Sequence, residues 1–202
     1  MRNKILITMA AAGMVCGTSA FADTIPNADA GSGTISFSGS VIEAPCSIVP
    51  QSQNIQVNLG QVSVKSLTAA DKYSGAVPFS IDLTGCSFDT PPASGGTGTN
   101  YSKVAVDFTG SGLTSPTGGS LTKGEIANTA SDNPAGHVAI QLLKSDASTP
   151  VDLSKAPTAG DIALDTSSTT SQLKFYARMY TLGEAATSGN VGATITYKLK
   201  YF

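Results

Sequence analysis

The sequence of 202 residues has no tryptophan, a single histidine and three cysteines, and only 13% of its side chains are charged. A catalytic triad needs a base that a carboxylate orients toward a nucleophile, whereas His137 opens a strand-like segment after a glycine-rich loop. A solvated side chain is the ordinary interpretation of such a histidine. No Gly-x-Ser-x-Gly motif or cluster of metal ligands accompanies it. We therefore expect no enzyme, no cofactor and no metal site.

The chain also lacks long helical patterns. No heptad repeat, long amphipathic helix or alternation of strands with helices is present, which argues against coiled coils and α/β folds. The long apolar run at residues 5–15 is too short for a permanent membrane anchor. It follows Arg2 and Lys4 and precedes the small-x-small motif Ala-Phe-Ala at 20–22. We expect residues 1–22 to be a signal peptide that is removed on export.

The mature chain would have 180 residues (202 minus 22), enough for one sandwich-sized domain with its own core. Removing Arg2 and Lys4 leaves ten basic and fourteen acidic side chains, a formal net charge of −4. Because no basic stripe is available for phosphate groups, we expect no nucleic-acid partner. Glycine, serine, threonine and alanine are abundant, which is typical of a secreted β-protein with many turns.

Cys46 and Cys86 are the cysteines that remain once Cys16 leaves with the signal peptide. An even pair in an exported chain is most simply a disulfide, and closing a loop of about 40 residues contributes on the order of 3 to 4 kcal/mol through the unfolded state. The alternatives are a metal pair or a redox pair. Metal sites need more ligands than two sulfurs and one distant histidine, and redox pairs usually lie close in sequence. We predict a Cys46–Cys86 disulfide.

Alternating apolar and polar residues predict a series of short strands. Turn-rich segments separate them, among them a long loop at residues 89–100 (DTPPASGGTGTN). Seven or more short strands with turns between them are typical of an all-β sandwich. The expected strands are residues 33–41, 53–59, 77–83, 103–109, 137–143, 149–153, 173–180 and 194–202.

The first and the last of these segments can be interpreted in two ways. Residues 33–41 (GTISFSGSV) alternate strictly and follow a loose polar stretch at 23–32, and residues 193–201 alternate almost to the end of the chain. Each could be an ordinary sandwich strand tied into its own sheet. The alternative is a strand whose neighbour belongs to another molecule. The flexible tether favours this alternative for the first segment.

Further motifs follow in a definite order along the chain. Residues 33–41 continue through Ala44-Pro45-Cys46-Ser47-Ile48, and Gly189 lies fourteenth from the end with Tyr201 as the penultimate residue. The motifs between them are VNLGQV at 57–62, FSIDLTGC at 79–86, VAIQLL at 138–143 and FYARMY at 175–180. In order and spacing, the mature chain resembles the major pilins of chaperone–usher fimbriae, of the type 1 and P pilus kind. Phe202 departs from that pattern, because related pilins often end in a polar residue.

The resemblance implies an all-β fold, namely an incomplete immunoglobulin-like sandwich that lacks its last strand and is completed by a donor strand from a neighbouring subunit. Residues 23–41 would be the N-terminal donor-strand arm, and residues 42–202 the pilin domain with a hydrophobic groove beside its C-terminal strand. The donor-strand residues would be Ile35, Phe37, Gly39 and Val41, with Gly39 over a shallow spot. The residues of the C-terminal groove strand would be Gly189, Ile195, Tyr197, Leu199 and Tyr201.

The same resemblance implies a structural subunit of a surface fimbria, exported through the periplasm, that polymerises head to tail by donor-strand exchange and supports adhesion. Its partners would be other copies of itself, other fimbrial subunits, a periplasmic pilus chaperone and an outer-membrane usher. A minor adaptor or a tip-associated adhesin is the alternative. A tip adhesin usually adds a lectin domain, for which this chain is too short, and tryptophan is absent. We therefore expect a shaft subunit.

Overall fold

The computed structural model describes residues 34–88 and 101–202, and its regular elements are short strands and single 3₁₀ turns. Residues up to Ser40 and residues Val41–Phe202 form two units, and each is described by itself. The all-β class expected from the sequence is confirmed. Within the described part, no helix is long and apolar enough to cross a membrane.

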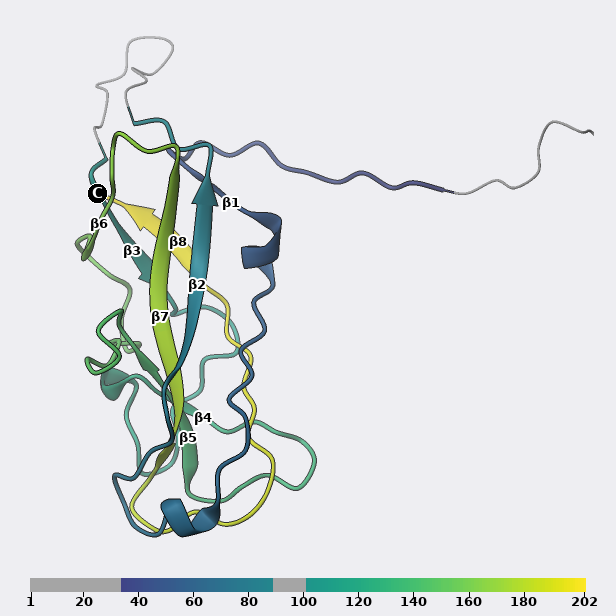
Figure 1. The fold of residues 1–202 in the computed structure, drawn as a ribbon, viewed down its shortest axis with the longest axis vertical. Helices are drawn as coiled ribbons and strands as arrows, with labels where there is room; N and C mark the ends of the chain where they lie inside the picture. Colours follow the sequence, from purple (N-terminus) through teal and green to yellow (C-terminus); the bar gives the residue numbers. More distant parts are fainter. Residues whose placement is uncertain (1–33, 89–100) are drawn as a thin grey trace, which may run out of the picture. The chain divides into compact units, whose positions relative to one another are not determined.

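Two sheets make up the Val41–Phe202 unit (Figure 1). The larger sheet has the strand order β1-β2-β7-β5-β4 and the smaller sheet has the order β6-β3-β8, with antiparallel pairing throughout. The larger sheet consists of β1 (Ser47–Ile48), β2 (Val77–Thr84), β4 (Glu125–Ala127), β5 (Val138–Leu143) and β7 (Thr170–Thr181). The smaller sheet consists of β3 (Lys103–Asp107), β6 (Ile162–Ala163) and β8 (Lys198–Tyr201). The 3₁₀ turns are η1 (Pro50–Gln53), η2 (Val64–Ser66) and η3 (Leu121–Lys123).

The pairing of β2 with β7 is the longest ladder of the fold. Its register places Ile81 opposite Leu173, and both side chains are fully buried. Phe79 lies opposite Phe175, and the two rings stack with their centroids 5.8 Å apart. Strict alternation puts these apolar side chains on one face, as expected for strands with one buried face.

The hydrophobic core lies between the two sheets, because its members come from the inner faces of both. Phe108, which follows β3, meets Phe175 of β7 edge to face, with ring centroids 5.4 Å apart. The core residues include Ile81, Leu83, Val104, Val106, Phe108, Leu142, Leu173 and Phe175. The two-layer arrangement follows from the need of each sheet to cover its apolar face.

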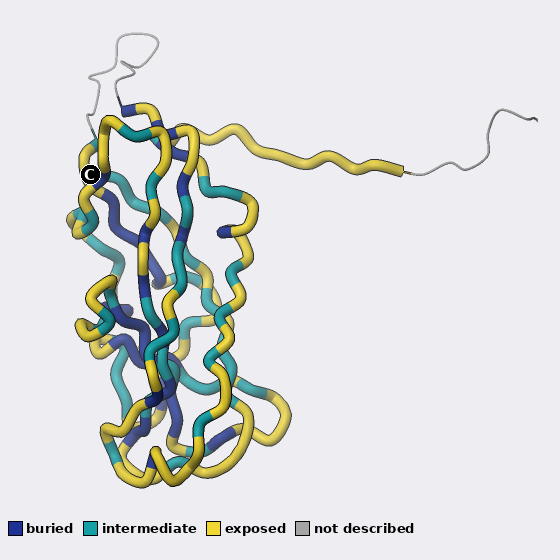
Figure 2. The backbone as a smooth tube through the Cα atoms, viewed as in Figure 1, coloured by how far each residue is buried: buried dark blue, intermediate teal, exposed yellow. Residues whose placement is uncertain are grey.

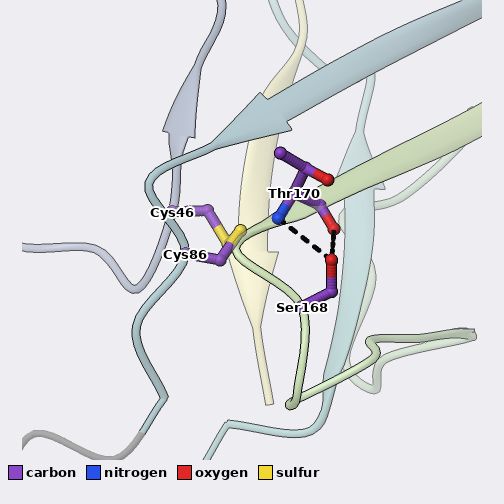
Figure 3. Close-up of a disulfide and its surroundings, with 4 residues drawn as sticks. All are labelled: Cys46, Cys86, Ser168 and Thr170. Atoms are coloured by element: carbon purple, nitrogen blue, oxygen red, sulfur yellow. Dashed lines mark hydrogen bonds between the residues drawn. A yellow bond between two sulfur atoms is a disulfide. The ribbon is translucent and has the colours of Figure 1, made fainter.

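The structure joins Cys46 and Cys86 in a disulfide, as the sequence predicted (Figure 3). The bond links the residue before β1 to the segment after β2, and Ser87 N donates to Pro45 O at 2.8 Å beside it. Cys86 N donates to Thr169 O at 3.0 Å, so the bridge is also tied to the start of β7. The chain just before β1 is therefore fixed to the larger sheet.

Several of the expected strands are absent or shorter in the structure. Residues 53–59 and 149–153 form no strand, and of residues 194–202 only β8 is a strand. Residues 34–41 are likewise without a strand, and residue 33 and the loop 89–100 lie outside the described residues. The alternation was identified correctly, but a strand also needs a continuous ladder of hydrogen bonds to a neighbour. Residues 54–62 have no such bonds in the described part of the chain, and residues 149–153 and 194–197 have only isolated ones, such as Val151 N to Leu142 O and Thr196 N to Ser111 O.

Candidate functional site

Two extended segments, each with an unpaired backbone edge, flank an apolar groove. We call residues 53–62 the first wall and residues 191–197 the second wall. Along the first wall, Ile55, Val57 and Leu59 are half-buried, and the residues between them are exposed (Figure 2). No backbone hydrogen bond to another segment is found for residues 54–62 within the described part of the chain. The first wall therefore has the side-chain pattern of a strand without a neighbour.

The second wall continues into β8 and is paired on one side only. Thr196 N donates to Ser111 O at 3.0 Å, and Lys198 lies opposite Asp107 of β3. Because backbone groups alternate in direction along an extended chain, the amide and carbonyl groups of Ile195 and Tyr197 point to the opposite side. Among the described residues, these groups have no hydrogen-bond partner. The second wall thus presents a free edge toward the groove.

The groove consists of two connected cavities of about 590 and about 740 Å³. The first lies between residues 53–57 and 193–197, and the second between residues 57–62 and 186–193, so the two walls run antiparallel. The residues that line both cavities form their junction, and they are Val57, Leu59, Ile140 and Ala193. The floor of the first cavity includes Phe79, Ile81, Phe108, Ile126 and Leu142, and that of the second includes Val138 and Met179.

Unpaired backbone beside exposed apolar side chains is a template for a further strand. An inserted strand would donate to and accept from both walls, and its inward side chains would cover the floor. Because the walls run antiparallel, such a strand would be parallel to one wall and antiparallel to the other. Within the described residues there is no cluster of His, Cys, Asp or Glu suited to a metal ion. The geometry of the groove is suited to the addition of a strand.

One hydrogen bond crosses the end of the groove. The hydroxyl of Tyr197 donates to Ser52 O at 2.6 Å, and burial raises the pKa of this phenol. Ser52 is 3% exposed, and its hydroxyl accepts from Asp82 N of β2 at 2.9 Å. This contact could not be predicted from local sequence patterns, because its partners lie 145 residues apart.

The five residues expected along the C-terminal groove strand fall into two groups. Gly189, Ile195 and Tyr197 line the groove. Leu199 and Tyr201 lie in β8 and pack against the core without lining either cavity. The hydroxyl of Tyr201 is buried without a hydrogen-bond partner among the described residues, and burial raises its pKa to about 12.

Gly189 has a physical reason for its identity that the sequence did not reveal. A Cβ atom at this position would lie 2.5 Å from both Ala135 N and Asn133 O. The neighbouring Asn190 N donates to Asn133 O at 2.7 Å, which holds the two segments together. Only a residue without a side chain allows the backbone to approach so closely.

The expected donor-strand residues lie on an extended, exposed segment. Ile35, Phe37 and Val41 are 78%, 90% and 102% exposed, and nothing lies within 4 Å of a Cβ built at Gly39. Exposure of three large apolar side chains at alternate positions is unusual for a secreted protein, because each loses the free energy of burial.

His137, the residue that an enzymatic interpretation would need, lies at the surface. Its imidazole is 3.6 Å from the carboxylate of Glu184, and both side chains are largely exposed. No serine, threonine or cysteine side chain is hydrogen-bonded to it in the described part of the chain. His137 and Glu184 are therefore two neighbouring surface side chains.

Comparison with known proteins gives a consistent result. The family model for fimbrial proteins matches residues 35–202. The F17 fimbrial protein of Escherichia coli is 35% identical over 172 residues, which covers 84% of this chain and 87% of that protein. The type-1 fimbrial protein A chain of Escherichia coli is 32% identical over 202 residues, 100% of both chains. A chain in the structure of a chaperone–usher pilus has a TM-score of 0.65 at 24% identity, over 88% of this chain and 99% of that chain.

Proposed function

Because the chain belongs to the fimbrial protein family and is a non-enzymatic structural subunit of a surface fimbria of the chaperone–usher class, we propose that it polymerises by donor-strand exchange. Residues 34–41 of one copy would occupy the groove between the two walls of the next. The fold would then be an incomplete immunoglobulin-like sandwich that the arm completes. The observation that carries this proposal is the groove itself, which has two free backbone edges and an apolar floor.

The two cavities suggest a register for the arm. Phe37 and Ile35 would fill the first cavity, whose floor is aromatic and aliphatic, and Val41 would fill the second. Gly39 would then lie at the junction of the two cavities, beside Val57, Ile140 and Ala193. This order makes the arm antiparallel to the second wall and parallel to the first. A slip by one residue would turn every apolar side chain away from the floor.

The expected gain from this contact is large. Three large apolar side chains at about 1.5 to 3 kcal/mol each, with a ladder of main-chain bonds on both sides, give a gross stabilisation on the order of 10 kcal/mol before ordering costs. Because arm and groove are different surfaces, the contact is head to tail and does not close on itself. It therefore propagates into a fibre.

The chain carries both an arm and a groove, and this supports an internal position in the fibre. A subunit that ends a fibre needs only one of the two elements. We assign the protein to the fimbrial shaft. Electron microscopy of immunolabelled cells that express the fimbrial genes tests this assignment. Label along the whole fibre is expected, whereas label confined to tips would indicate a minor adaptor.

Two further partners follow from the physics of the empty groove. An exposed apolar groove with unpaired edges promotes aggregation, so the subunit needs cover before it is assembled. A periplasmic chaperone that lends a strand would provide this cover, and an outer-membrane usher would exchange that strand for the arm of the next subunit. Purification of the subunit from the periplasm with and without its chaperone tests the first step. Aggregated or degraded subunit is expected in the absence of the chaperone.

Moving the arm within the chain tests the central claim. Residues 23–41 are removed from the front and attached after Phe202 through a flexible linker that is long enough to turn back along the second wall. Intramolecular closure then has a high effective concentration. We expect a soluble monomer that unfolds at much higher guanidinium concentration than the unmodified chain. The control carries the same linker and arm with Ile35, Phe37 and Val41 changed to serine.

Size-exclusion chromatography and guanidinium unfolding provide the measurements. The control should behave like a chain without an arm, since it keeps the length but loses the apolar side chains. If the unmodified chain is equally monomeric and equally stable without a chaperone, the domain is already complete and donor-strand exchange is wrong.

A further inference from the structure

The hydrogen bond between Tyr197 and Ser52 is the only one between residues 50–62 and residues 191–202 in the described part of the chain. Its two ends are anchored in different sheets. Tyr197 lies just before β8, and Ser52 is tied to β2 by Asp82 N and to Val49 O by its own amide at 2.9 Å. The bond therefore connects the two sheets across the end of the groove.

Aromatic packing also holds the side chain of Tyr197 in this position. Its ring lies near that of Phe108, with centroids 6.4 Å apart, and Phe108 in turn packs against Phe175. Tyr197 has the same parity as Ile195, so its side chain points toward the core and crosses beneath the gap between the walls. Tyr197 also lines the first cavity.

The two walls have a reason to close on each other. They run antiparallel, both have unpaired backbone groups, and direct pairing would satisfy those groups and cover the apolar floor. Paired strands lie about 5 Å apart, whereas flanking strands with one strand between them lie about 10 Å apart. A tyrosine side chain together with the hydrogen bond that it donates spans about the distance between two strands that flank a third strand.

We propose that Tyr197 is a spacer that holds the two walls one strand-width apart and so keeps the groove open to the incoming arm. This inference rests on the proposed donor-strand exchange. Tyr197 is a positioning residue, because it acts through the width of the gap. Its loss shifts the free subunit toward a closed form in which the walls pair with each other. Only the open fraction can take up an arm, so the apparent rate of uptake falls with that fraction.

The test uses the full secreted chain, refolded by dilution and mixed with an excess of a fluorescent peptide that has the sequence of residues 32–43. Fluorescence anisotropy gives the association rate, the dissociation rate and the loss of binding competence during a delay before mixing. Tyr197→Phe removes the hydroxyl and keeps the ring. We expect association to slow about fivefold or more, the change that one neutral hydrogen bond typically makes to an equilibrium, with an unchanged dissociation rate.

Tyr201→Phe is the matched control, because it removes a phenol oxygen four residues further along, from a side chain of the same parity whose hydroxyl has no partner among the described residues. We expect it to behave like the unmodified chain. Ser52→Ala is the second variant. It removes the acceptor for Asp82 N, loosens the carbonyl that Tyr197 needs, and should slow association in the same direction as Tyr197→Phe.

The outcomes separate the spacer from the function on which it rests. If the unmodified chain does not bind the peptide, donor-strand exchange itself is wrong, and the spacer with it. If the unmodified chain binds and Tyr197→Phe binds at the same rate, only the spacer is wrong. A faster dissociation from Tyr197→Phe with unchanged association would also overturn the spacer, since it would show that the hydroxyl merely stabilises the filled groove.

Discussion

The β2–β7 pair and the two walls of the groove have the same kind of sequence but different surroundings. In β2, Ile81 and Leu83 alternate with polar residues and are buried against β7. In the first wall, Ile55, Val57 and Leu59 alternate just as regularly and remain half-buried without a neighbour. Alternation thus indicates that a segment has one apolar face suited to burial. It does not report where the hydrogen-bonded neighbour comes from.

The comparison also separates stability from function within one unit. Segments with full ladders and buried side chains resist local opening, whereas segments with few bonds open easily. The β2–β7 pair therefore stabilises the free subunit, whereas under the proposed donor-strand exchange the walls would be stabilised by the arm of another copy. Substitutions in β2 and β7 should mainly lower the free energy of unfolding of the free subunit. Substitutions in the walls should matter mainly when an arm is present.

The largest effect is expected for a core residue of the paired sheet. Leu173→Ala removes a fully buried side chain and should lower the free energy of unfolding by about 2 to 5 kcal/mol. Ile195→Ala in the second wall should cost about 1 kcal/mol or less in the free subunit, because its side chain is only half-buried. Urea unfolding measures both. In the chain with the relocated arm, the cost of Ile195→Ala should rise, and an unchanged cost would argue against the comparison.

The next effect concerns the disulfide that anchors the chain ahead of the first wall. Replacing Cys46 and Cys86 together by serine should lower the free energy of unfolding by about 3 to 4 kcal/mol, the entropy of closing a loop of that length. Because the first wall has no ladder, its amide protons should exchange quickly with or without the disulfide, and the loss of protection should appear in β2. Equal loss in the two regions would contradict the distinction between them.

Gly39→Leu should act on assembly alone. In the proposed register the added side chain would point at the junction of the two cavities, and overpacking costs about 1 to 3 kcal/mol. Fibre yield should fall while the free subunit unfolds at an unchanged denaturant concentration, because position 39 is exposed there. Ser38→Leu places the same leucine side chain on the opposite face of the arm and should assemble normally. Normal fibres from Gly39→Leu would show that the proposed register is wrong.

The smallest effect is expected at alkaline pH, from the buried end of the C-terminal strand. Burial raises the pKa of Tyr201 to about 12 in the folded protein, above the unfolded value of about 10. The stability due to the protonated phenol is therefore complete below pH 10 and is lost as the pH rises through 12. Unfolding free energies measured across this range should fall less steeply in Tyr201→Phe. A slope identical to that of the unmodified chain would exclude Tyr201 as its source.

Much of the fold could be predicted from local pattern. The strands at β2, β3, β5 and β7 appeared as alternating segments, and each has its neighbour inside the same chain. The disulfide followed from an even pair of cysteines in an exported chain. The strand predictions succeeded because alternation depends on residues that are close in sequence. The disulfide prediction succeeded because the pairing of the two remaining cysteines does not depend on their separation along the chain.

The groove itself could not be predicted from periodicity. Residues 53–59 were expected to form an ordinary strand, and only the assembled body shows that this segment faces the second wall across an open gap. The role of Gly189 depends on the close approach of Asn133 and Ala135. Such contacts join residues that are far apart in sequence, so no local pattern contains them.

The sequence by itself determined the all-β class, the alternation of the arm and the walls, and the pairing of the two cysteines, since hydrophobic periodicity and composition act locally. The tertiary structure decided which alternating segments found partners, where the two cavities meet, and that a phenol of the second wall reaches the carbonyl of Ser52. The reason is geometric. A backbone edge is free or paired only with respect to the segments that folding brings beside it, and that arrangement is a property of the whole chain.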